Sequence, residues 1–83
     1  MDHAHAITPE AANHVLFHYG RGGYQAGSFT EQIIKAIDMA DPANRDKLAL
    51  GFPGYVAAVT AIQYDPDGVA HLTAIANPGE VAA

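Results

Sequence analysis

The chain has 83 residues, 49% of them hydrophobic, and a formal net charge of −5 at pH 7, a size at which one small domain buries about 60% of its unfolded surface. Its four lysine and arginine residues are too few for the basic cluster that neutralises a phosphate backbone, which argues against nucleic-acid binding. The chain contains no cysteine, which excludes disulfide bonds and metal sites built on thiolates.

Residues 1–7 are expected to form a frayed N-terminal arm. The first five residues, Met-Asp-His-Ala-His, lack the basic-then-apolar order of a signal peptide, and no apolar run approaches the length that spans a membrane. We therefore expect a soluble cytoplasmic protein with no membrane contact.

A first helix is predicted over residues 9–19. Thr8 is a favourable N-cap residue, Pro9 suits the first helical position, and Gly20 ends the helix. One face of this helix is apolar and is expected to enter the core, comprising Ala12, Val15, Leu16 and Tyr19. Phe17 points away from that face.

The same stretch also fits a β-hairpin. Residues 15–19 and 24–29 would form its strands, joined across the glycines. Val15, Phe17 and Tyr19 alternate with other residues as they would in a strand. The helix is the better interpretation, because its start signal is explicit and an isolated hairpin is only marginally stable.

A glycine-rich loop over residues 20–27 leads into a helix predicted over residues 29–40. Ser28 and Glu31 have the spacing of a capping box, in which each side chain accepts a hydrogen bond from the backbone N–H of the other residue. The apolar residues of this helix fall on one broad face with Ile34 at its edge, comprising Phe29, Ile33, Ala36, Ile37 and Ala40. Because so wide a face can touch several neighbours, we expect this helix to lie at the centre of the fold.

Three further short helices are predicted, over residues 42–50, 53–64 and 66–77. Asp41 and Asp65 each precede a proline and repeat the start signal of the first helix. Between them, Gly51 and Pro53 force a sharp corner, where Phe52 is expected to be tucked into the core.

Small and charged residues of these three helices predict which of their sides face solvent and which can pack closely on another helix. Arg45 lies in a polar run and is expected to be solvated. Ala57 and Ala61 form a smooth side that either lets another helix approach closely or reflects only the helix propensity of alanine. Gly68 is expected to weaken the first turn of the last helix.

These elements together predict an all-α fold, a compact bundle of about five short helices with one glycine-rich loop. The helical domain covers residues 8–78, and residues 79–83 are expected to form a loose tail. No internal repeat or interdomain linker divides the chain.

His14 and His18 lie four residues apart on one face of the first predicted helix, which is the spacing of two metal ligands. The residues between them are Val-Leu-Phe, so the HExxH pattern of zinc proteases is absent. A third ligand would have to come from His71 or from a distant carboxylate. A small ligand- or metal-binding protein that uses this pair and the glycine-rich loop is the alternative interpretation.

The sequence holds no recognisable catalytic group. Ser28 is the only serine and lacks the nucleophile-elbow context of a hydrolase. Gln25 stands where a glycine would be needed to complete a dinucleotide-binding pattern. Asp65 and Asp67 suit a helix start, where acidic residues are favoured without any acid–base role. We therefore expect no enzymatic activity, no cofactor and no metal.

Three strings of the sequence carry a resemblance to known proteins. They are HYGRGGYQAGSFT at 18–30, DPANR at 41–45 and LALGFPGYV at 48–56. With these strings the chain resembles a group of small uncharacterised proteins of actinobacterial phages and prophages. The resemblance implies a phage or prophage source and the cytoplasm of the infected host, and it carries no activity.

The surface beside the glycine-rich loop is the expected functional region. Aromatic and arginine side chains are favoured at the centres of protein interfaces. The expected contact residues are Phe17, Arg21, Tyr24 and Gln25. We expect a non-catalytic helical module that binds a host protein or assembles with itself, so that a homo-oligomer is compatible with this function.

Overall fold

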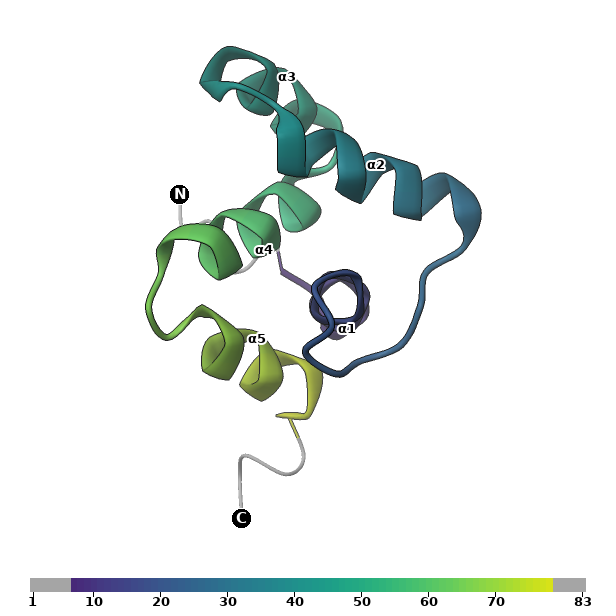
Figure 1. The fold of residues 1–83 in the computed structure, drawn as a ribbon, viewed down its shortest axis with the longest axis vertical. Helices are drawn as coiled ribbons and strands as arrows, with labels where there is room; N and C mark the ends of the chain where they lie inside the picture. Colours follow the sequence, from purple (N-terminus) through teal and green to yellow (C-terminus); the bar gives the residue numbers. More distant parts are fainter. Residues whose placement is uncertain (1–6, 79–83) are drawn as a thin grey trace.

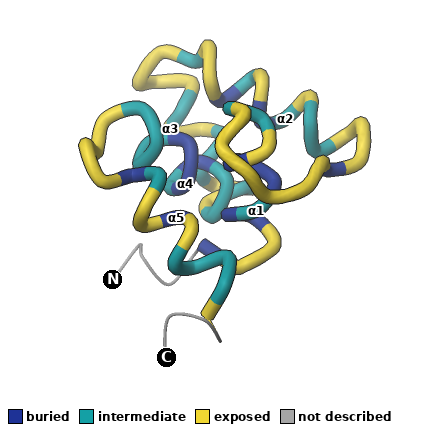
Figure 2. Tube along the Cα trace, turned by 60° about the horizontal axis from the view of Figure 1, so that its bottom comes forward, coloured by how far each residue is buried: buried dark blue, intermediate teal, exposed yellow. Residues whose placement is uncertain are grey.

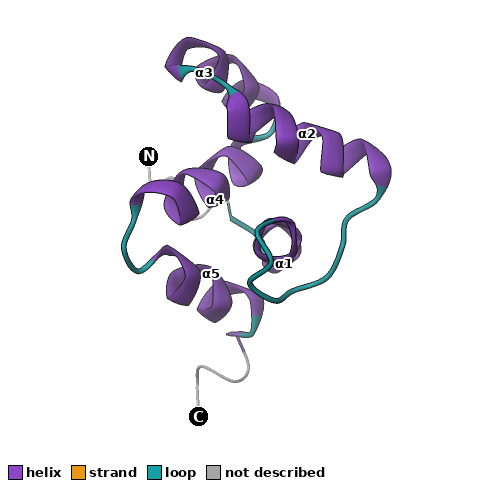
Figure 3. Ribbon diagram, viewed as in Figure 1, coloured by secondary structure: helices purple, strands orange, loops and turns teal. Residues whose placement is uncertain are grey.

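A computed structural model describes residues 7–78 of the chain, and within that range the fold consists of helices with no strand. The five helices are α1 (Pro9–His18), α2 (Ser28–Met39), α3 (Pro42–Gly51), α4 (Pro53–Tyr64) and α5 (Gly68–Ala76) (Figure 1; Figure 3). The predicted all-α class and five-helix bundle are confirmed, and the alternative hairpin across the glycines is wrong.

The two ends of the chain are only partly described. The expected arm and tail fall outside residues 7–78, apart from Ile7 at the end of the arm. Ile7 is buried and belongs to the hydrophobic core. The last residue assigned to the arm is therefore part of the folded domain.

Two of the three predicted cap-and-proline signals form as expected. The Thr8 hydroxyl accepts a hydrogen bond from the N–H of Ala11 at 3.0 Å, and Asp41 Oδ1 accepts one from the N–H of Asn44 at 2.8 Å. The third signal does not cap its helix. Asp65 Oδ1 accepts from the N–H of Asp67 at 2.9 Å and closes a turn, so α5 begins at Gly68 instead of residue 66.

Helix α4 is the centre of the fold, because it contacts all four other helices. Its buried residues Val56, Ala58 and Val59 belong to the same hydrophobic core as the buried residues of α1, α2 and α5. Figure 2 shows the buried positions gathered where the helices meet. The expected central position of α2 is therefore wrong: α2 lies to one side and packs on α1 and α4.

The buried face of α2 is also turned relative to the predicted one. Ile34, expected at the edge, is 0% exposed, as is Ile37. Phe29, expected in the core, is 67% exposed and lies beside Phe52, with 6.2 Å between the ring centroids. Phe52 is only half-buried, so the two rings pack on each other at the surface.

Gly68 allows α5 to pack directly on α4. It is buried, and a Cβ atom added to it would lie 2.1 Å from the carbonyl oxygen of Ala61. This close approach, rather than a weakened first turn, explains a glycine here. The small-residue side of α4 at Ala61 thus receives another helix of the same chain.

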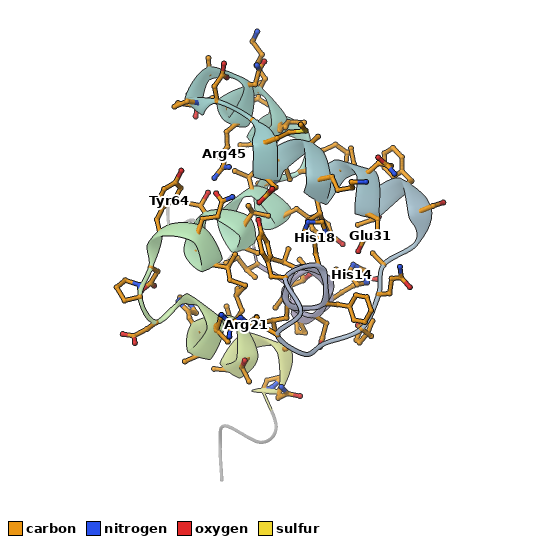
Figure 4. The ribbon with its side chains drawn as sticks, in the orientation of Figure 1. His14, His18, Arg21, Glu31, Arg45 and Tyr64 are labelled. Carbon is orange, nitrogen blue, oxygen red and sulfur yellow. The ribbon has the colours of Figure 1, made fainter. Side chains whose placement is uncertain are left out.

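Arg45 ties α3 to α2 and α4 and is not solvated as predicted. One guanidinium nitrogen, Nη2, donates to the carbonyl oxygen of Ile37 at 2.7 Å, and Nη1 donates to the Thr60 hydroxyl at 3.3 Å. The guanidinium also lies 6.0 Å from the centre of the Tyr64 ring (Figure 4). The contact with Ile37 satisfies a carbonyl group near the end of α2.

Candidate functional site

The glycine-rich loop leaves α1 through a Schellman motif. Gly20 adopts φ +72° and donates from its N–H to the carbonyl of Phe17 at 3.0 Å. The next N–H, of Arg21, donates to the carbonyl of Leu16 at 2.9 Å. These two bonds are the pair that defines the motif, and they fix the direction in which the loop turns back.

The loop then lies directly on the backbone of α1. Gly22 and Gly23 have φ of +111° and +71°, a region that disfavours other residues. A Cβ atom on Gly23 would lie 2.1 Å from the carbonyl oxygen of Asn13. Glycine at position 23 is therefore required both by its backbone angle and by this contact.

Tyr24 continues the contact between the loop and α1. Its ring meets the His14 ring edge to face, with 5.3 Å between the centroids. His14 is buried, and its Nδ1 lies 2.8 Å from the Tyr55 hydroxyl of α4. Tyr24 thus rests on a histidine that is itself held by the central helix.

All four predicted contact residues lie at the surface. Phe17 is 42% exposed and Tyr24 51% exposed, and Arg21 and Gln25 are exposed as well. Phe17 lies one turn after Asn13 on the same side of α1, which is the side on which the loop lies. The structure thus brings Phe17 and the loop residues to one side of α1.

The predicted capping box at the start of α2 is wrong. Gly27 is the N-cap residue, and no side chain caps this end. Glu31 instead turns toward α1, where its Oε1 lies 3.1 Å from Nδ1 of His18 (Figure 4). Both side chains are half-buried, and their contact joins the start of α2 to the end of α1.

The two histidines of the proposed metal pair face different partners. His14 contacts Tyr55 and His18 contacts Glu31. Within residues 7–78, no group of three or more histidine, aspartate or glutamate side chains is placed to hold a metal ion. The pair serves here to attach α1 to α4 and α2.

A second polar contact joins α1 to α2 and α4. The Tyr19 hydroxyl donates to Oδ1 of Asp38, and Gln63 Nε2 donates to the same oxygen at 2.8 Å. Burial, together with the neighbouring Asp38 carboxylate, raises the pKa of Tyr19 well above its ordinary value of 10.0. Burial and the Glu10 carboxylate raise the pKa of Tyr55 in the same direction.

These two tyrosines predict a loss of stability in alkali. Because both folded-state pKa values lie above the unfolded value of 10.0, their contribution is complete below pH 10 and is lost as the pH rises toward the folded-state values. Tyr19→Phe should cost about 1 kcal/mol at neutral pH through its lost hydrogen bonds, yet its stability should fall less steeply above pH 10. Urea unfolding across this pH range measures both effects.

Tyr64→Phe is the matched control for the loss at neutral pH, since it also removes one phenol. The Tyr64 ring is 74% exposed, so this variant should lose less stability at neutral pH than Tyr19→Phe. Equal slopes for Tyr19→Phe and the wild type would contradict the prediction.

Most of these contacts join residues that are far apart in the sequence, so no local pattern predicts them. Tyr55 is 41 residues from His14, and Gln63 is 44 residues from Tyr19. A local pattern identifies the spacing of two residues on one helix but not the distant side chain that meets them. For Glu31, the capping-box spacing predicted a contact with Ser28, whereas its carboxylate lies beside His18.

The fold and loop define a small all-α bundle whose glycine-rich loop is fixed to its first helix. No protein-family model, curated protein or solved structure matches this chain. None of the helices between residues 7 and 78 is long and apolar enough to cross a membrane.

Proposed function

We propose that this chain is a small non-catalytic protein-interaction module that binds a host protein through the side of the glycine-rich loop. The contact surface consists of Phe17, Arg21, Tyr24 and Gln25. The observation that carries the proposal is the combination of a fixed loop with exposed aromatic rings. Gly23 is pressed against Asn13, while Tyr24 and Phe17 remain about half exposed.

A loop fixed before binding favours a tight complex. Ordering an interface costs roughly 0.5–1.5 kcal/mol for each immobilised flexible side chain, and a preformed surface avoids part of that cost. Tyrosine and arginine are enriched among the residues that dominate interface energies. The Schellman motif and the His14 contact supply the preformed backbone and ring position.

The resemblance to actinobacterial phage and prophage proteins supports a host protein as the partner. A phage-encoded module acts in the cytoplasm of the infected cell, where host proteins are the most abundant binding surfaces. We therefore take a soluble actinobacterial host protein as the partner and the phage as the source of the chain.

An affinity pull-down from actinobacterial lysate tests this function. The test variant is Arg21→Ala with Tyr24→Ala. Lys35→Ala with Tyr64→Ala is the matched control, because it also removes one cation and one exposed tyrosine, outside the loop. The host protein should be captured by the wild type and the control and lost with the loop variant.

A direct titration of the captured protein then measures the effect. Loss of a dominant interface residue costs at least about 2 kcal/mol, which corresponds to binding about 30-fold weaker. Circular dichroism should show all three proteins folded at the assay temperature, although each variant loses one ring contact, that of Tyr24 with His14 or that of Tyr64 with Arg45, and should melt slightly earlier than the wild type. Equal affinity of the loop variant and the wild type would refute the assignment of the surface.

A further inference from the structure

One side of α2 carries an apolar stripe, which consists of Phe29, Ile33 and Ala36 and continues to Ala40, the C-cap residue of the helix. Their spacing of four, three and four residues is that of a helix-pairing seam. Phe29 is 67% exposed and the other three are half-buried. The stripe lies about 100° around the helix from the buried residues Ile34 and Ile37, at the edge of the buried side, and its Ile33 still packs against the hydrophobic core.

Beside this α2 stripe, α3 forms the second wall of an open groove. The groove has a volume of about 540 Å³, with Ala36 and Ala40 on one wall and Leu48 on the other. Met39, which also lines it, is 81% exposed. No residue of α3 is buried, and the helix lies at the edge of the molecule (Figure 1). This corner of the fold therefore has an apolar groove floor bordered by the polar residues Asp41, Asn44 and Lys47, and a helix with little burial of its own.

We propose that this face binds a second copy of the chain, with the two α2 helices packed antiparallel about a two-fold axis. The order of large and small residues along the stripe favours a second copy of the chain as the binding partner. Its N-terminal half holds the large residues Phe29 and Ile33, and its C-terminal half holds Ala36 and Ala40. In an antiparallel pair, each large residue meets a small one of the second copy, as a self-complementary two-fold interface requires.

The charges along α2 complement each other in the same arrangement. Its N-terminal end has no side-chain cap, so its free N–H groups carry the positive end of the helix dipole, while the first-turn carboxylate of Glu31 is turned toward His18 of α1. Its C-terminal end has no basic residue in the last turn and is followed by Asp41, which lines the groove. Antiparallel packing brings the acidic end of one α2 to the positive end of the other.

The stripe itself is uncharged, which matters for a chain with a net charge of −5. Two identical acidic copies repel each other over most of their surface. The residues that flank the stripe, Gln32 and Met39, are also uncharged. Two copies can therefore meet along this face without opposing like charges at its centre.

The area available predicts a weak dimer. An aromatic side chain can bury about 150–250 Å² of surface. Phe29 is 67% exposed, so roughly 100–170 Å² of its surface is available for burial in a dimer. With Met39, the rest of a helix about 18 Å long and the α3 wall, two copies would bury on the order of 1,000 Å² in total, near the lower bound for a specific interface. Dimerisation should accordingly appear only toward high protein concentration.

Sedimentation equilibrium of the full chain over a concentration series up to the millimolar range tests the proposal. The apparent mass of the wild type should rise from 8.7 kDa toward twice that value. Ala36→Glu places a charge at the centre of the stripe and should remain a monomer, with dimerisation at least tenfold weaker. Lys35→Gln changes the net charge by the same amount on the other side of α2 and should dimerise like the wild type.

Cross-linking tests the orientation and does not depend on the fold of the charged variant. Because the chain has no cysteine, Phe29→Cys and Ala40→Cys can be introduced in separate copies and mixed under oxidising conditions. Antiparallel packing predicts disulfides between the two variants. Disulfides only within each variant would overturn the orientation, and a wild type that stays monomeric at every concentration would overturn the interface.

The proposed dimer interface and the proposed host-binding surface can be refuted independently of each other. The variant Arg21→Ala with Tyr24→Ala should dimerise like the wild type, and Ala36→Glu should still capture the host protein. If Ala36→Glu dimerised as strongly as the wild type, the α2 stripe would be excluded as the interface.

Discussion

Replacing Ile34 with alanine should lower the free energy of unfolding by about 2–5 kcal/mol, the usual cost of deleting a buried isoleucine side chain. Ile34 is 0% exposed and packs within the core beneath α2. Truncation removes apolar surface from the core and leaves a cavity that the surrounding helices fill only in part. Urea unfolding followed by circular dichroism measures the change.

Ile33→Ala is the matched control, because it makes the same change at the adjacent position. Ile33 is only half-buried, so its truncation should cost less than half as much as that of Ile34. Both measurements belong at a low protein concentration, because Ile33 also belongs to the α2 stripe. Equal losses, or a larger loss at Ile33, would mean that α2 is rotated so that Ile33 enters the core at least as deeply as Ile34.

The helix ends beside Thr8, Gly20 and Asp41 were predictable, because these residues act through backbone groups within a few residues. Such signals are local, and tertiary contacts did not alter them. The face that α2 buries was not predictable in the same way, because its apolar arc is wide enough to include both Ile34 and Phe29.

The corrections at polar residues share one physical cause. A side chain whose local partner is available in sequence, such as Glu31 for a capping box, can find a better one in space. Glu31 contacts His18 of α1, and Arg45 reaches Ile37 and Thr60 of two other helices. Half-buried charged groups favour such contacts because water no longer surrounds them fully.

For the candidate site, the surface position of the contact residues was predictable, and the fixed conformation of the glycine-rich loop was not. The sequence placed Arg21 and Tyr24 beside glycines, which indicated a turn. Glycines by themselves fit a flexible loop as well as a fixed one. Only the carbonyl of Asn13 against Gly23 and the ring of His14 beside Tyr24 distinguish the two, and neither contact has a signature in the order of residues.

Replacing Gly68 with alanine should also destabilise the fold strongly, by about 3 kcal/mol. The new methyl group would lie 2.1 Å from the carbonyl oxygen of Ala61, and 2.9 Å from the Cα of Ile62. Both atoms belong to the backbone of α4, which cannot move aside as a flexible side chain would. The two helices would have to separate, and Leu72 of α5, which is fully buried, would lose contacts.

Thermal unfolding of Gly68→Ala should therefore begin far below that of the wild type, with a midpoint about 12–24 °C lower for a domain of this size. Gly51→Ala is the control, because a Cβ atom at that exposed position meets nothing within 4 Å. Alanine there loses less backbone entropy on folding and should raise stability by up to about 1 kcal/mol. If Gly68→Ala melted with the wild type, α5 would not approach α4 as closely as described, and the contact between these helices would have to be formed by their side chains alone.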